Sequence, residues 1–120
     1  MIVNVTQHVA TPEQKAQGVH DLPGEVRKEL SQLLTFEELP TRESLLTRAT
    51  QVAQLISPFE GDSVMIGGAP FFMPLLELVL QQEGWKVVYA FSRREAVEDI
   101  QPDGSVRKTA MFRHVGFVEA

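Results

Sequence analysis

The 120-residue sequence contains no cysteine. A chain without thiols has no cysteine nucleophile, no disulfide framework, no cysteine-ligated zinc and no iron–sulfur cluster. Its three histidines, at positions 8, 20 and 114, are too far apart in sequence to form an HxxxH zinc pattern. We therefore expect no metal and no cofactor, and the lack of cysteine is compatible with a reducing cytoplasm.

Long hydrophobic runs and an excess of positive charge are also missing. The longest apolar-rich segment, residues 65–80, contains two prolines and a glutamate and is too short to span a bilayer. With no signal peptide visible at the N-terminus, a cytoplasmic protein without membrane contact is expected. Sixteen acidic residues against eleven basic ones give a formal charge of −5, so a long nucleic acid is not an expected partner.

Several nucleotide-binding and catalytic motifs are absent as well. The sequence has no GxGxxG fingerprint, no GxxxxGK[ST] loop, no GxSxG elbow and no paired aspartates after a strand. Dinucleotide binding, P-loop chemistry and a serine hydrolase of the elbow type are therefore poorly supported.

The hydrophobic pattern predicts one α/β domain over residues 1–120. A strand is expected at 2–5, followed by helices at 11–18, 22–34 and 41–56; Thr11 and Thr41 have the spacing of helix N-caps. Between residues 34 and 39, either a brief strand or an irregular crossing is compatible with the sequence.

Residues 63–91 have the pattern of a βαβ unit. A buried strand at 63–66 leads into Gly67-Gly68-Ala69-Pro70, a helix at 71–82 ends near Gly84, and a second apolar strand occupies 85–91. Such a connection requires parallel strands. Beyond it, polar–apolar runs at 95–101 and 105–111 flank Pro102-Asp103-Gly104 and predict a β-hairpin, with 112–118 extended or irregular. The expected fold is a small Rossmann-like three-layer α/β fold with a mainly parallel sheet and a C-terminal β-hairpin.

Ligands of open parallel sheets gather beyond the carboxyl ends of the strands. Three loops are expected there: Thr6-Gln7-His8, residues 67–71 and Ser92-Arg93-Arg94. The glycines allow close backbone approach, and the arginines could hold phosphate in a bidentate manner. Each feature also has a structural alternative: a simple tight turn, surface ion pairs with Glu95, a packed His114, and core positions for the phenylalanines at 71 and 72.

Some of these segments resemble a known family. Thr6-Gln7-His8, Thr11-Pro12-Glu13-Gln14 and the tail 92–118, with its motifs Ser-Arg-Arg-Glu-Ala-Val-Glu, Gln-Pro-Asp-Gly-Ser-Val-Arg-Lys-Thr and Phe-Arg-His-Val-Gly-Phe, are similar to small CRISPR-associated proteins of type III systems. These proteins are grouped with ring nucleases, and the resemblance extends to their phage and mobile-element relatives. It covers about a third of the chain, and the middle matches only in its strand–glycine–helix layout.

The resemblance implies a Rossmann-like homodimer that binds a cyclic oligoadenylate and, in some members, cleaves it without metal. Cleavage would proceed by attack of a ribose 2′-hydroxyl on the adjacent phosphate. Carried onto this chain, it implies a catalytic set of His8, His114 and Arg94. The implied ligand-binding residues are Thr6, Gln7, Gly67, Gly68, Ala69, Phe71, Ser92, Arg93 and Arg113. The acidic balance of the chain departs from what a ligand with several phosphates would favour.

Three functional hypotheses follow. The first is a protein that binds a cyclic oligonucleotide and degrades it. The second is a protein that sequesters the nucleotide without turnover. The third is an interaction protein of a mobile element whose hairpin adds a strand to a partner's sheet.

Overall fold

The computed structural model describes residues 1–120 as a mixed α/β protein. The elements, in chain order, are β1 (Ile2–Val5), α1 (Pro12–Ala16), β2 (Val19–His20), α2 (Gly24–Leu34), α3 (Arg42–Ile56), β3 (Ser63–Ile66), α4 (Met73–Gln82), β4 (Lys86–Ile100) and β5 (Val106–Glu119). None of the helices combines the length and apolar character needed to cross a membrane.

The five strands form one sheet in the order β2-β1-β3-β4-β5. The first four strands are parallel to their neighbours, and β5 is antiparallel to β4. The predicted βαβ unit is confirmed, because Ser63 pairs with Lys86 and Val64 with Val87 on either side of the α4 crossover. Strand β2 lies on one side of β1, and β3, β4 and β5 lie on the other side. The strand order therefore reverses between β1 and β3.

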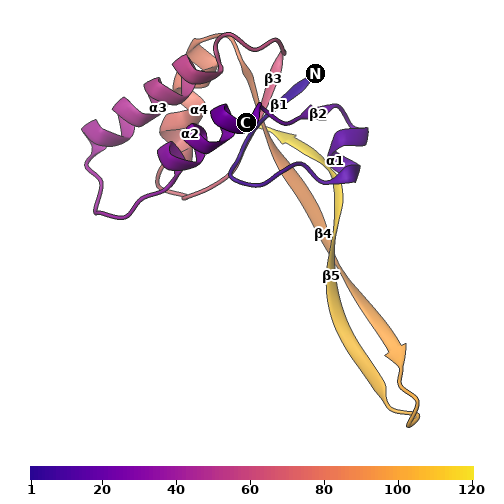
Figure 1. The fold of residues 1–120 in the computed structure, drawn as a ribbon. Helices are drawn as coiled ribbons and strands as arrows, with labels where there is room; N and C mark the ends of the chain where they lie inside the picture. Colours follow the sequence, from indigo (N-terminus) through magenta and orange to yellow (C-terminus); the bar gives the residue numbers. More distant parts are fainter.

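The two faces of the sheet are covered unequally (Figure 1). Helices α2, α3 and α4 lie together on one face, where they bury alternate strand residues such as Val5, Ile66 and Val87 in an 18-residue cluster. The other face has the five-residue helix α1 and a cluster of four buried residues: Ala10, Val19, Met65 and Val88. The main hydrophobic core therefore lies between the sheet and three helices.

The helix N-caps are those that the sequence predicts. Thr11 accepts a hydrogen bond from the Gln14 N–H, and the Gln14 side chain accepts one from the Thr11 N–H. Thr41 and Ser44 form the same reciprocal pair at the start of α3. Each pair satisfies N–H groups that would otherwise lack a partner at the helix end.

Two elements differ from the sequence-based expectations, and one open alternative is decided. The two-residue strand β2 was not predicted, since Val19–His20 is too short to show alternation. Residues 35–39 form no strand, so the irregular crossing is the correct alternative. Helix α4 begins at Met73 and not at residue 71, because Ala69 to Phe72 form a turn closed by the Phe72 N–H and the Ala69 carbonyl.

The C-terminal hairpin is confirmed, but it is much longer than predicted. Strand β4 runs from Lys86 to Ile100 and β5 from Val106 to Glu119, with a shift in their pairing register between Phe91 and Ser92. The expected loop at Ser92-Arg93-Arg94 is therefore wrong, as is the irregular alternative for 112–118. These two segments pair with each other, Ser92 with His114 and Arg94 with Phe112, so antiparallel hydrogen bonds hold both extended.

Residues 92–114 of this hairpin, called the arm below, project from the rest of the molecule (Figure 1). The remaining residues, 1–91 and 115–120, are called the body. Principal extents of 57 × 34 × 27 Å and a radius of gyration of 17.3 Å describe an elongated shape. A compact chain of this length has a radius of gyration of about 14 Å. None of the arm residues is buried.

Candidate functional site

The loop after β1 is organised by Asn4, a polar side chain that is only 3% exposed. Its amide nitrogen donates to the His8 carbonyl at 2.7 Å and to the Asp21 carboxylate at 2.8 Å. Its oxygen accepts from the backbone N–H and the hydroxyl of Thr6. A buried amide with its donors and its acceptor satisfied gives the Thr6–His8 segment a defined conformation.

Asp21 completes this network from the segment after β2. Burial by itself would raise the pKa of Asp21, but hydrogen bonds from Asn4 and from the Ala10 N–H, with Lys15 and Arg27 nearby, lower it below its usual range. The Lys15 ammonium lies 3.8 Å from this carboxylate. The carboxylate therefore stays ionised at neutral pH, and its hydrogen bonds with Asn4 and Ala10 stabilise the β1–α1 connection.

A pocket of about 370 Å³, the strand-end pocket, lies beyond the carboxyl ends of β1 and β3. This is the place where the strand order reverses, which in open α/β sheets is the usual ligand position. It is lined by residues of the β1–α1 loop, the β3–α4 turn and β4: Thr6, Gln7, His8, Val9, Thr11, Gln14, Met65, Ile66, Gly67, Gly68, Tyr89 and Ala90. Five residues that the sequence assigned to the site are thus brought together.

Two features of the lining bear on its chemistry. Gly68 has a φ of 152°, a conformation that favours glycine, and the N–H groups of Gly68, Ala69 and Phe71 donate to no atom of the protein. On the opposite wall, the Tyr89 hydroxyl donates to the Glu77 carboxylate. Burial, with the adjacent Glu77 carboxylate, raises the pKa of Tyr89, so the phenol remains protonated at neutral pH.

A second pocket, the α2 pocket, shares Thr6 and Gln7 with the first and has a volume of about 400 Å³. Its other lining residues come from the first three turns of α2: Gly24, Arg27, Lys28, Ser31 and Gln32. It contains two cations and no carboxylate, and neither cation has an ion-pair partner within 4.0 Å. Neither Arg27 nor Lys28 was predicted from the sequence as a site residue.

A third pocket, the arm pocket, lies between α1 and the base of the arm and has a volume of about 610 Å³. It shares Thr11 and Gln14 with the strand-end pocket, so the two adjoin. Its remaining lining residues are Glu13, Ser92, Glu95, Met111, Phe112, Arg113 and His114. Two carboxylates line this pocket, and the Arg113 guanidinium lies 3.5 Å from one of them, that of Glu95.

His114 is held by α1. Its Nε2 lies 2.7 Å from the Gln17 Oε1, and the Gln17 amide nitrogen donates to the Val115 carbonyl, which orients the amide. Nε2 therefore carries the proton, and Nδ1 is a buried nitrogen without a partner. The ring also packs edge-on against Phe117 at 5.0 Å. These contacts are those of the packed histidine that the sequence analysis weighed as the alternative.

The other predicted site residues lie outside these pockets. Arg93 and Arg94 lie on exposed positions of the arm, and neither lines a described pocket. Phe71 is half exposed and packs edge-on against Phe36, with ring centroids 5.0 Å apart. Ala69 packs against the main core. The structure therefore separates the two predicted arginines from the glycine turn that they were expected to face.

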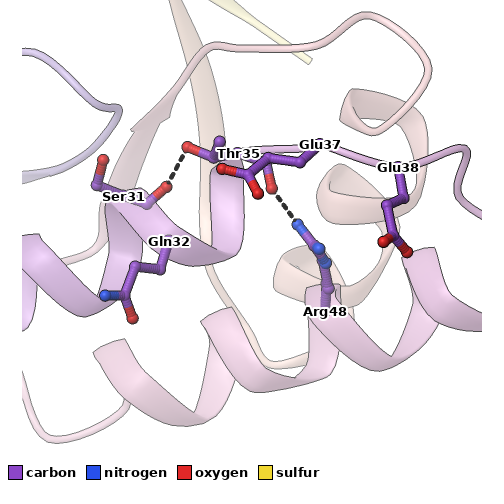
Figure 2. A pocket seen from close by; sticks show the side chains of 6 residues that line it. All are labelled: Ser31, Gln32, Thr35, Glu37, Glu38 and Arg48. Atoms are coloured by element: carbon purple, nitrogen blue, oxygen red, sulfur yellow. Dashed lines mark hydrogen bonds between the residues drawn. The ribbon is translucent and has the colours of Figure 1, made fainter.

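A further pocket of about 520 Å³ lies where α2 meets α3 (Figure 2). Figure 2 shows Arg48 reaching from α3 to the Thr35 carbonyl, while the Thr35 hydroxyl donates to the Ser31 carbonyl. The Arg48 guanidinium also lies 4.3 Å from the centroid of the Phe36 ring. Arg48 donates to the Leu33 and Thr35 carbonyls at the end of α2, so its role here is to connect α3 to α2. We do not assign a ligand to this pocket.

No group of three or more His, Asp or Glu side chains is placed to hold a metal ion. The polar groups available at the strand ends are backbone N–H groups, hydroxyls, amides, the exposed His8 ring and two cations, beside an apolar wall that includes Val9 and Met65. Such a set is suited to an anionic ligand with polar edges.

The fold and the pockets define a class: a mixed α/β protein with a mostly parallel sheet, pockets at the strand ends and a long antiparallel arm. The sequence identifies a particular family within this class: the profile of the Uncharacterized protein MJ1673 family matches residues 1–118 of the chain. The chain belongs to this family. No curated protein and no solved structure matches it significantly.

Proposed function

We propose that this protein binds a nucleotide at the strand-end and α2 pockets, and that the nucleotide is a cyclic oligonucleotide of the oligoadenylate type. In this proposal the body is a Rossmann-like domain, since its strand order β2-β1-β3-β4 is that of a doubly wound sheet with a ligand at the β1/β3 reversal. The ligand class comes from the resemblance of the β1–α1 loop and the tail to ring nucleases.

The observation that carries the proposal is the pair Arg27 and Lys28. They line a pocket without carboxylates, they are free of ion pairs, and they adjoin the carboxyl end of β1 through Thr6 and Gln7. Arginine recognises phosphate through paired N–H groups, and lysine adds a point charge. These two residues take the role that the sequence analysis gave to Arg93 and Arg94.

The rest of the ligand has polar partners in the adjoining pockets. The free N–H groups of the β3–α4 turn are further donors for phosphate oxygens. Thr11 and Gln14 connect the strand-end pocket to the arm pocket. Their side-chain oxygens accept hydrogen bonds in the capping box, but the Thr11 hydroxyl and the Gln14 amide nitrogen can still donate to the edges of a ribose or base. The volumes, about 370, 400 and 610 Å³, lie in the usual range for small-molecule sites, so a ligand larger than one nucleotide can extend across them.

If turnover occurs, His8 is the proton-transfer group in this proposal. A ribose 2′-oxygen would form a bond to the adjacent phosphorus while the bond to the 5′-oxygen breaks, which gives a 2′,3′-cyclic phosphate and a free 5′-hydroxyl. His8 would take the 2′-hydroxyl proton, and the leaving oxygen would gain a proton from water or from His8 after that transfer. The His8 ring is exposed and free of hydrogen bonds, whereas His114 is engaged by Gln17.

One observation favours sequestration without turnover as the second candidate. With His114 held by α1 and Arg94 on the arm, two of the three expected catalytic residues do not line the strand-end pocket. A single histidine and a set of phosphate contacts would suffice for binding alone.

Thermal denaturation with cyclic di-, tri-, tetra- and hexanucleotides and ordinary mononucleotides tests the proposal. A ligand at a hundred times its Kd adds about 2.7 kcal/mol, which raises Tm by several degrees in a domain of this size. We expect one ring size to raise Tm, Arg27→Ala with Lys28→Ala to abolish the shift, and the matched control Arg93→Ala with Arg94→Ala to retain it.

Chromatography of the same samples separates a nuclease, which consumes the ring, from a sequestering protein, which leaves it intact. In the first case His8→Ala should retain the Tm shift and lose turnover. If none of the nucleotides raised Tm, the proposed ligand class would be wrong. A shift that is lost in the arm variant and kept in the α2 variant would show that the site assignment is wrong.

A further inference from the structure

A cavity of about 390 Å³, called the Trp85 cavity below, lies beyond the amino ends of β3 and β4. It is therefore at the opposite end of these strands from the strand-end pocket, and the two have no lining residue in common. Its wall comes from the end of α3, the segment before β3 and the turn before β4: Ala53, Ser57, Phe59, Glu60, Gly61, Glu83, Gly84 and Trp85. A cavity of this size is within the usual range for a small molecule.

Two aromatic side chains contribute to this wall. Phe59 and Trp85 are both partly buried, and they pack against the main core while they line the cavity. Gly61 allows the Trp85 ring to pack closely, because a Cβ at position 61 would lie 3.0 Å from the Val3 side chain and 3.3 Å from that ring. The ring is thus held in place by the fold. The face of an indole is the aromatic surface that attracts a cation most strongly.

The charged side chains of the wall are all negative. Glu60 and Glu83 are exposed and have no ion pair, and no lysine, arginine or histidine lines the cavity. Two neighbouring cations are engaged elsewhere. The N-terminal ammonium lies 3.2 Å from Asp62, and the Lys86 ammonium lies 3.6 Å from Glu119. No cation of the chain therefore neutralises the two glutamates.

Two helix ends add to the negative potential at this place. The C-terminal end of α3 reaches the cavity through Ala53 and Ser57, and that of α4 through Glu83, its C-cap residue. Backbone dipoles give a helix C-terminus a partial negative charge, which cations stabilise. Neither helix has a basic residue in its last turn, so a cation from outside the chain is the missing complement.

We propose that the Trp85 cavity binds a small organic cation that carries an alkylammonium group. The ammonium would lie against the Phe59 and Trp85 rings, with Glu60 and Glu83 as its counter-charges. An organic cation suits this wall better than a metal ion, because the aromatic rings supply no oxygen ligands and no group of three side chains is placed to hold a metal. This site is additional to the proposed nucleotide site and does not depend on it.

Fluorescence of the full chain tests the proposal, because Trp85 is its only tryptophan. Choline chloride and butylammonium chloride are titrated at constant ionic strength. Sodium chloride and 3,3-dimethylbutan-1-ol, the uncharged carbon analogue of choline, are the controls. We expect a saturable change in fluorescence for at least one of the two cations and none for the controls. The dissociation constant should be on the order of 1 mM, since such a small ligand makes few contacts.

Two pairs of substitutions separate this site from the general charge of the protein. Glu60→Gln with Glu83→Gln removes both counter-charges at exposed positions and should weaken binding by about three- to tenfold. Glu37→Gln with Glu38→Gln changes the net charge equally at exposed residues outside the cavity, so it should bind as the wild type does.

Phe59→Leu tests the aromatic wall and keeps Trp85 as the reporter. Loss of this ring should weaken cation binding at least about threefold. Circular dichroism shows whether the variant is folded. Should it not fold, the glutamate pairs, which leave the core intact, still decide the question.

Three outcomes would overturn the inference. If neither ammonium ion gave a saturable change, the cavity would not be a cation site. An equal response to 3,3-dimethylbutan-1-ol would show that the cavity takes any apolar group. Equal weakening by the two glutamate pairs would mean that the overall charge of the protein attracts the cation. None of these measurements uses a nucleotide, so their failure is distinct from failure of the proposed function.

Discussion

The body and the arm of this protein are stabilised by different interactions. All 24 buried residues lie in the body, where one face of the sheet is covered by three helices and the other by α1 and its loop. The arm has cross-strand pairs from Ser92–His114 to Ile100–Val106 and no buried side chain. A folded core therefore stabilises the body, whereas the arm depends on its cross-strand hydrogen bonds and on the contacts at its base.

The base of the arm is where the two regions connect. Gln17, the C-cap residue of α1, contacts both the His114 ring and the Val115 carbonyl, and Phe117 packs with the second, smaller core cluster. Beyond this point the arm has only its own hydrogen bonds and two surface ion pairs. A few contacts at the base of the arm therefore fix its orientation relative to the body.

The largest expected difference is between apolar substitutions in the two regions. Leu76→Ala in the body removes a side chain with no exposed surface and should lower the free energy of unfolding by about 2–5 kcal/mol. Phe112→Ala in the arm should change it by less than about 0.5 kcal/mol at protein concentrations where the chain is monomeric. Urea unfolding followed by circular dichroism measures both. A loss of 2 kcal/mol or more for Phe112→Ala in the monomer would mean that the arm packs on its own body.

The body was more predictable from sequence than the arm because its signals are local. The threonine caps, the glycine after β3 and the apolar runs of β3 and β4 each act within a few residues. The continuous arm strands could not be predicted in the same way, since the polar run Ser92 to Glu95 has the composition of a loop. It is extended because its partner, Met111 to His114, supplies hydrogen bonds from nearly twenty residues further along the chain.

The candidate site was predictable in part for a similar reason. Parallel strands end at the same edge of a sheet, so the loops after β1 and β3 were expected to meet, and both line the strand-end pocket. Arg27 and Lys28 were missed because only the packing of α2 beside β1 brings them to that edge. Asn4 did leave a signal in the sequence: it is a single amide within an apolar four-residue strand, and such a side chain, once buried, needs hydrogen-bond partners.

An effect of intermediate size is expected for the pH dependence of unfolding, which should differ between the body and the arm. The pKa of Asp21 is lowered in the folded body, so near the ordinary carboxyl value of 3.8 the unfolded chain binds more protons than the folded one. The associated stability is complete above about pH 4 and is lost as pH falls through the folded pKa. We expect Asp21→Asn to show a smaller loss of stability below pH 4 than the wild type in urea titrations.

Asp103 is the matched control in the arm. Burial affects it little, and hydrogen bonds from the Ser105 side chain and backbone lower its pKa at the tip of the hairpin. Since the tip is remote from the core, Asp103→Asn should leave the acid unfolding of the body unchanged. Equal effects of the two substitutions would contradict the view that the tip and the body unfold independently.

The smallest expected effects are those of two ion pairs with nearly equal separations. Lys108 and Glu98 lie 3.7 Å apart on the arm with both side chains well exposed, while Lys15 lies 3.8 Å from Asp21, whose side chain is only 20% exposed. Screening by water should limit the coupling of the arm pair to about 0–0.5 kcal/mol. The body pair should couple more strongly, because its carboxylate is fixed by Asn4 and partly removed from water. Double-mutant cycles with alanine measure both coupling energies. Added salt should remove the coupling of the exposed arm pair before that of the body pair. An arm coupling as large as that of the body pair would show that the arm is shielded from water in the state measured.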